Sequence, residues 1–79
     1  MLARPKEEAM AESVYKVIEL VGTSPESWER AAAVALAEAK KTLRDLRIAE
    51  VEALDIHIDD HGEIIAYRTK LKVSFKYED

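Results

Sequence analysis

Two imidazoles and two carboxylates lie within the five residues from His57 to His61. Imidazole nitrogens and carboxylate oxygens are ligands that transition metals accept, so this segment is a natural place to look for metal chemistry. The same run, HIDDHG, holds the Asp and Gly residues that favour a tight turn. Strand alternation places His57 on the sheet face that would meet a helix and leaves the other three residues in the turn. A turn is therefore the stronger interpretation, and a transition-metal site the weaker one.

A second set of chemically active side chains is a basic row near the C-terminus. Its members are Arg68, Lys70, Lys72 and Lys76. In a strand these residues share one face, where they could bind a phosphate or another anion. Glu50 and Glu52 lie at cross-strand positions that would neutralise most of the row. We expect an anion site to centre on Arg68, because the residue opposite it, Leu54, carries no charge.

Catalytic arrangements are missing from the sequence. Ser24 and Ser27 have no histidine at a recognisable spacing, and no glycine-rich loop is available to hold a phosphate group. The sequence therefore favours a binding or structural protein over an enzyme.

The composition restricts the partners. The 79 residues include 12 basic and 16 acidic side chains, a net charge of −4, which argues against general nucleic-acid binding. The chain has no cysteine, which excludes disulfides and thiolate metal sites and is compatible with a reducing, cytoplasmic location. No apolar run approaches the roughly 20 residues of a membrane span, and the N-terminus lacks the apolar core of a secretory signal, so we expect no membrane partner.

One long amphipathic helix, from Thr23 to Leu46, is expected to organise the domain. Ser24 is expected to cap its first N–H groups, and Pro25 suits the first helical position. Apolar residues then recur with a 3.6-residue period, which gives a stripe that must be buried. The stripe consists of Trp28, Ala32, Ala35, Leu36, Ala39, Leu43 and Leu46.

Three strands are expected beside this helix, at residues 13–21, 47–58 and 63–77. The second and third are joined by a short glycine-bearing turn, as in an antiparallel hairpin. Residues 1–12 are expected to form a mobile N-terminal tail, so the domain spans residues 13–79. The prediction is an α+β fold of β-α-β-β order, with a three-stranded antiparallel sheet on one helix.

Matching faces across the hairpin predicts its register. Val51 is expected opposite Leu71 on the helix side, with the odd-numbered residues of strand 63–77 facing the helix. The far face of strand 47–58 then carries four apolar residues: Ile48, Leu54, Ile56 and Ile58. One helix cannot cover both faces of a three-stranded sheet, so we expect this second apolar face to contact another copy of the chain or a ligand.

Three segments of this chain resemble the dodecin family. They are VYKVIELVGTSPESWERAAA, LRIAEVEALDIHI and AYRTKLKVSFKYED, and the resemblance covers residues 13–79, with ELVGTS and AEV among its most specific parts. It implies a sheet wrapped around the long helix and a hollow assembly of twelve subunits with cubic symmetry. It also implies sequestration of flavins, riboflavin or FMN, stacked in pairs between aromatic side chains.

Two residues depart from the pattern of flavin-binding dodecins. By this resemblance the stacking tryptophan falls at Ile48, and the glutamine that contacts the flavin ring edge falls at Arg68. Isoleucine has no π face, and arginine donates hydrogen bonds but cannot accept them. We therefore expect flavin binding to be weakened or lost. The context of Trp28, which is expected to be a packing anchor, and the pair Tyr67-Arg68 are similar to the calcium dodecins, a flavin-poor branch of the family.

Two functions remain open after this comparison of motifs: a storage cage for a small ligand or ion, and a structural assembly without cargo. Flavin sequestration is the further alternative. Calcium is the candidate ion, because three copies of one carboxylate on a threefold axis supply three oxygens, to which waters add to complete the six to eight that calcium prefers. Asp59, Asp60 and Glu63 are the first candidates, because the turn leaves them without charge partners. Solvated turn residues are the stronger interpretation of these three, and a calcium site is the weaker one.

Overall fold

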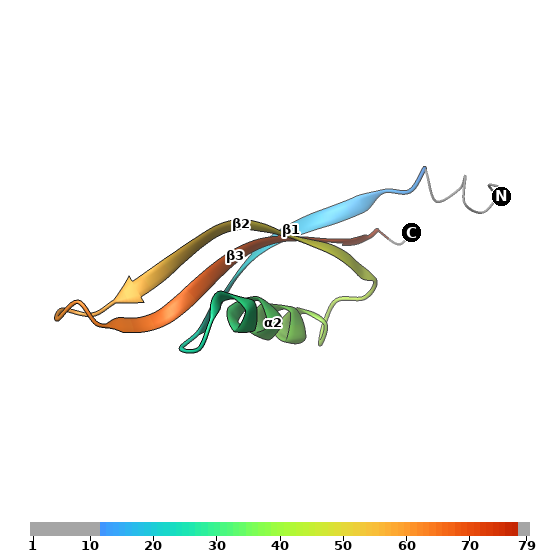
Figure 1. Cartoon of the computed structure of the whole chain (residues 1–79). Helices are drawn as coiled ribbons and strands as arrows, with labels where there is room; N and C mark the ends of the chain where they lie inside the picture. The colour runs from blue at the N-terminus through green and yellow to red at the C-terminus, as the bar shows by residue number, and fades with distance from the viewer. Residues whose placement is uncertain (1–11, 78–79) are drawn as a thin grey trace, which may run out of the picture.

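The computed structural model describes residues 12–77, so the expected tail lies outside the described residues except for Glu12. The strands β1, β3 and β2 form one antiparallel sheet in that order, and the helix α2 lies on one face of it (Figure 1). The predicted α+β fold with β-α-β-β order is confirmed. The elements are β1 (Tyr15–Ser24), α2 (Trp28–Ala39), β2 (Leu46–Ile58) and β3 (Ile64–Lys76).

The helix begins one turn later than the sequence predicts. Ser27 is its N-cap, and the Ser27 hydroxyl accepts the Arg30 N–H at 2.9 Å. Ser24 is instead the last residue of β1, where it pairs with β3, and its hydroxyl accepts the Glu26 N–H at 3.0 Å. The predicted start was wrong because two serines have the right chemistry for a cap, and pairing in the sheet extends β1 through the first of them.

The helix also ends earlier than expected, at Ala39 and not at Leu46. Hydrogen bonds from the Thr42 and Leu43 N–H groups to the Ala39 carbonyl close the next turns. Asp45 then takes a left-handed conformation with φ of 59°, which lets the chain reverse into β2. Leu46 still packs against the core, so the apolar period continues past the point where the helix stops.

The core lies between α2 and the inner, helix-facing side of β1 and β3. The buried apolar residues are Ala31, Ala35, Ala39, Leu71 and Val73. On β3 the odd-numbered residues face the helix as predicted, and the buried Thr69 hydroxyl donates to the Trp28 carbonyl at 2.8 Å. Three of the five buried apolar residues are alanines, which lets the helix backbone approach the sheet closely.

Gly22 is required by this close approach. A Cβ atom at position 22 would overlap the Ala31 carbonyl group and would lie 3.0 Å from the Ala35 Cβ. Backbone atoms of β1 and α2 are therefore in direct contact, and only a residue without a side chain fits between them.

A β-bulge between Val51 and Ala53, one of three register shifts along β2, changes which of its side chains face the helix. Val51 lies opposite Leu71, as predicted, but the register shifts before Ala53, which lies opposite Lys70. Beyond the bulge, Leu54 pairs with Thr69, and Ile56 pairs with Tyr67. Because paired residues point to the same face of a sheet, Leu54 and Ile56 lie on the helix side and not on the far face as expected.

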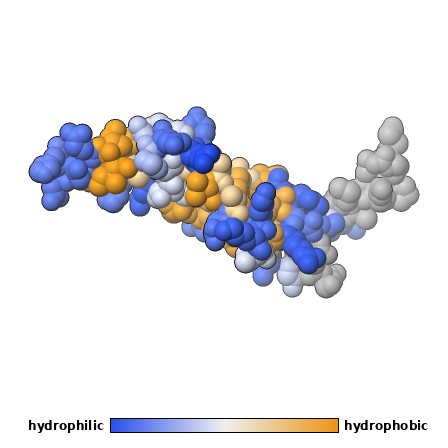
Figure 2. Space-filling model, turned by 90° about the horizontal axis from the view of Figure 1, so that it is seen from below, coloured by the Kyte–Doolittle hydropathy of each residue, from blue (hydrophilic) through white to orange (hydrophobic). Residues whose placement is uncertain are grey.

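The far half of the β2–β3 hairpin extends beyond the helix (Figure 1). We call this projecting segment the hairpin arm, residues 54–67. Figure 2 shows an apolar patch next to its hydrophilic tip. The large apolar side chains exposed along the arm are Leu54, Ile56, Ile58, Ile64 and Ile65. Part of the uncovered apolar surface therefore lies along the arm, and Ile48 remains on the far face.

We predict that Gly22→Ala destabilises the protein by about 1–3 kcal/mol, because the added methyl group must displace the helix backbone. Urea denaturation at fixed protein concentration measures the change. Gly62→Asn is the control: nothing lies within 4 Å of the position, and Asn tolerates its positive φ of 79°. Equal stability of Gly22→Ala and the native chain would contradict the close contact.

Candidate functional site

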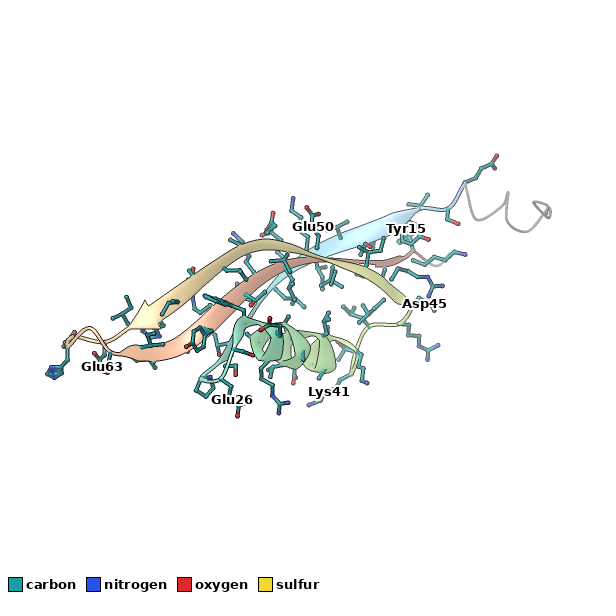
Figure 3. The ribbon with its side chains drawn as sticks, viewed as in Figure 1. Tyr15, Glu26, Lys41, Asp45, Glu50 and Glu63 are labelled. Atoms are coloured by element: carbon teal, nitrogen blue, oxygen red, sulfur yellow. The ribbon has the colours of Figure 1, made fainter. Side chains whose placement is uncertain are left out.

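The sheet face that points away from α2, here called the outer face, carries charged side chains from all three strands. Glu50 points away from the helix on this face (Figure 3). Cross-strand pairing arranges the outer face in rows from β1 through β3 to β2. These rows are Thr23–Arg68–Asp55, Val21–Lys70–Ala53, Glu19–Lys72–Glu50 and Val17–Ser74–Ile48.

Arg68 forms a bidentate ion pair with Asp55. The Arg68 Nε lies 2.6 Å from Oδ1 of Asp55, and Nη2 lies 2.8 Å from Oδ2. The hydrogen bond from Arg68 is the largest cause of the lowered pKa of the Asp55 carboxyl group, and it likewise raises the pKa of Arg68. The expectation that Leu54 leaves Arg68 without a charge partner is wrong, because the bulge brings Asp55 opposite Arg68.

The bulge also redistributes the charges in the next two rows. Glu52, which was expected opposite Lys70, instead pairs with Lys72 at 3.2 Å and raises the pKa of the Lys72 ammonium group. Lys70 then has Val21 on one side and Ala53 on the other. Lys70 therefore has no carboxylate opposite it, one row away from the position that the sequence predicts.

Ile48 lies on the outer face and is 67% exposed, opposite Ser74. Ser74 and Arg68 are six residues apart on β3, which corresponds to about 20 Å along a strand. Ile48 and Arg68 thus share a face, as expected, but one chain does not bring them together. A pocket that includes both positions would need a second subunit.

The three carboxylates of the expected calcium site lie in and beside the turn at the tip of the hairpin arm. Asp59 organises this turn, since its Oδ1 accepts the N–H groups of His61 at 2.8 Å and Glu63 at 2.9 Å. Glu63 lies at the end of the arm (Figure 3). Among residues 12–77 of a single chain, no three His, Asp or Glu side chains are grouped so that they could hold a metal. A site built from Asp59, Asp60 and Glu63 remains a prediction that requires several copies.

His57 lies on the outer face, opposite Ala66, and not on the helix side as the alternation suggested. The bulge again causes the change of face. His57 lines a shallow pocket of about 360 Å³ together with Asp55 and Arg68.

Trp28 contributes more than the packing contact expected from its sequence context. Its ring lies edge-on to Tyr67, with 5.1 Å between the ring centroids and an interplanar angle of 70°. Its Nε1–H donates to the Asp55 carbonyl at 3.0 Å, which joins the start of α2 to β2. No signal in the sequence predicted this hydrogen bond, because it depends on the bulge.

Two apolar grooves flank α2. A groove of about 470 Å³ runs between the helix and the start of β2 and is lined by residues that include Leu36, Leu46 and Val73. The second, of about 440 Å³, separates the helix from β1 and is lined in part by Ile18 and Leu20. Across the part of the chain that the structure describes, no helix has the length and apolar composition to cross a bilayer.

Comparison with known proteins agrees with this architecture. The family model described as Dodecin matches residues 14–78. The calcium dodecin of Mycobacterium tuberculosis is 53% identical over 64 residues, which cover 81% of this chain and 89% of that protein. The dodecin of Thermus thermophilus is 46% identical over 66 residues, which cover 84% of this chain and 94% of that protein.

A solved structure extends the comparison to three dimensions. The crystal structure of the calcium dodecin from Mycobacterium tuberculosis, described as a calcium-chelating antigen with a calcium-binding site, matches with a TM-score of 0.75 and 52% identity. The match covers 84% of this chain and 93% of that one. With the β-α-β-β fold and the family match over almost the whole length, the chain belongs to the dodecin family.

Proposed function

We propose that this chain is a self-assembling binding protein for a small ligand or ion, and not an enzyme. The observation that carries the proposal is an imbalance of apolar burial. Within residues 12–77, five apolar residues are buried, three of them alanines, whereas thirteen large hydrophobic residues are exposed. A domain of this size buries a modest fraction of its surface even when it is well packed, so an isolated subunit would lack stability.

The hairpin arm is the part of the surface that best fits contact with other copies. Leu54, Ile56 and Ile58 are the proposed interface residues, and they are 51%, 36% and 55% exposed. Closed symmetric assembly would bury the same patch on every subunit. The resemblance to dodecins supports a hollow shell of twelve subunits as the assembled form.

Flavin is a poor fit to the outer face of this chain. Ile48 offers apolar area without a π face. Arg68 would have to give up its two hydrogen bonds with Asp55 to contact a flavin ring edge through the same nitrogens. We therefore propose that flavin binding is weakened or lost, so that flavin sequestration is the less favoured function.

Calcium is the ion that the comparisons favour, because a relative that is 53% identical is named calcium dodecin. Carboxylate oxygens suit a hard cation such as calcium. In the turn, Asp59 already accepts two backbone N–H groups through one oxygen. Asp60 and Glu63 are therefore the freer candidates. We propose that copies of these carboxylates from several subunits together form the site.

The first test is the assembly itself. Twelve chains of 8.9 kDa give an expected mass of roughly 107 kDa in native mass spectrometry. Ile56→Lys should break the assembly, because an unpaired charge buried in a contact costs several kcal/mol. Lys41→Glu, at a helix end whose side chain is 68% exposed, is the control and should assemble normally. A monodisperse monomer of the native chain at micromolar concentration would disprove the cage.

The second test is flavin titration followed by fluorescence quenching. Riboflavin and FMN should bind at least about tenfold more weakly than to dodecins with a tryptophan at the position of Ile48. Two contributions are lost together: the aromatic stack, worth about 0.5–1.5 kcal/mol, and the hydrogen-bond contact to the ring edge at the position of Arg68. Ile48→Trp combined with Arg68→Gln should strengthen binding, whereas Ile48→Leu should not. Tight flavin binding by the native chain would show that another residue replaces the missing aromatic ring.

The third test is isothermal titration with calcium. We expect binding heat from the native assembly and a clear loss of it in the double variant Asp60→Asn, Glu63→Gln, which keeps the turn contacts of Asp59. Glu38→Gln, an exposed carboxylate on α2, is the matched control. If millimolar calcium gives no heat above dilution, or if the double variant behaves like the native assembly, the proposed carboxylates do not form the site.

A further inference from the structure

Arg68 is the side chain of the outer face that is best suited to hold an anion. A guanidinium group presents two parallel N–H donors, which match the oxygens of a carboxylate or a phosphate group. The Arg68 side chain is 47% exposed and borders the shallow pocket of about 360 Å³ that His57 also lines. A small anion from solution can therefore reach the guanidinium group.

In this chain the carboxylate of Asp55 already occupies that group. Nε and Nη2 of Arg68 donate to the two carboxylate oxygens of Asp55 at 2.6 and 2.8 Å, so one carboxylate uses both parallel donors. Asp55 thus contacts Arg68 in the way in which an anionic ligand would. An incoming anion must either displace the Asp55 carboxylate or bind beside its negative charge.

Lys70 adds a second positive charge at the same place. It lies two residues from Arg68 on the same face of β3, about 7 Å along the strand. Its neighbours across the sheet, Val21 and Ala53, carry no charge. After the hydrogen bond from Arg68, the charge of Lys70 also helps to lower the pKa of the Asp55 carboxyl group. Without Asp55, two cations would lie side by side with no carboxylate opposite either of them.

We infer that Asp55 is a specificity-determining residue: its carboxylate occupies Arg68, the anion-binding group of the outer face, and so excludes phosphate-bearing ligands from this part of the surface. The pair is exposed, and exposed ion pairs are weak, so the repulsion between Asp55 and a phosphate dianion contributes beside the occupied hydrogen bonds. Together the two effects are expected to weaken phosphate binding about tenfold. This inference goes beyond the proposed assembly and the proposed calcium site.

The ion pair between Glu52 and Lys72 is a matched comparison on the same face. Lys72 is a single ammonium group that Glu52 contacts at 3.2 Å, and Glu19 and Glu50 flank it in the same row. Neutralising Glu52 would still leave two carboxylates beside Lys72. We therefore expect neutralisation of the acid to create an anion site at Arg68 but not at Lys72.

The test is binding of inorganic phosphate to the full-length assembled protein, measured by isothermal titration at fixed, low ionic strength. Asp55→Asn keeps the size of the side chain and removes its charge, and it should bind phosphate at least about tenfold more tightly than the native protein. Adding Arg68→Gln to Asp55→Asn should abolish this gain, and adding Lys70→Gln should reduce it.

Glu52→Gln is the control, because it changes the net charge by the same amount as Asp55→Asn. It should bind phosphate no better than the native protein. If Asp55→Asn and the native protein bind phosphate equally, the inference is overturned. An equal gain in Glu52→Gln would overturn it as well, because the effect would then come from net charge alone.

Native mass spectrometry checks that each variant assembles as the native protein does. If Asp55→Asn does not assemble, Asp55→Ser takes its place with the same expected gain, and phosphate binding no tighter than that of the native protein would again contradict the inference. The titration needs neither calcium nor flavin. A failure of the proposed calcium site or of the expected loss of flavin binding is therefore distinguishable from a failure of this inference.

Discussion

One extra residue in β2, at the bulge between Val51 and Ala53, determines the chemistry of the outer face. It places Asp55 opposite Arg68, directs Glu52 toward Lys72 and leaves Lys70 between two apolar neighbours. It also moves Leu54 and Ile56 to the helix side of the hairpin arm. A bulge increases the local twist of a strand. The residues beyond it point to the opposite faces from those that a regular register would give. The ion pair, the apolar neighbours of Lys70 and the helix-side position of Leu54 and Ile56 are therefore consequences of this bulge.

The sequence was sufficient to predict the strands, the hairpin and the register as far as Val51, because alternation and turn residues are local signals. It was not sufficient beyond that point. No glycine marks the bulge. The segment EVEALDIHI also alternates in the regular register, where Glu50 and Glu52 would lie opposite lysines of the next strand, so the sequence gives no reason to expect a bulge. The predicted start of the helix was wrong for a related reason. Ser24 and Ser27 are equally good caps, and only the pairing of β1 with β3 decides between them. For the site, the outer-face positions of Ile48 and Arg68 were predicted, whereas the partner of Arg68 and the reach of Trp28 depend on contacts between distant segments.

The alanine-rich contact between α2 and the sheet limits what one subunit can achieve alone. Gly22 and the three buried alanines bring two backbones together, which gives precise packing but removes little apolar area from water. The larger apolar residues are located instead on β1, on β2 and along the hairpin arm, where the helix does not cover them. This distribution is the one expected when folding of the subunit is coupled to its association with other copies. The apparent stability then depends on protein concentration.

The position of β2 at the edge of the sheet has a consequence for newly made chains. A strand of thirteen residues with one free edge offers its N–H and C=O groups to any other extended segment. Before partners arrive, such an edge favours disordered association between chains. The bulge interrupts the regular spacing of those groups, which makes the edge a poorer template for a second strand. The irregularity in β2 therefore also interrupts the one long free edge that this strand offers.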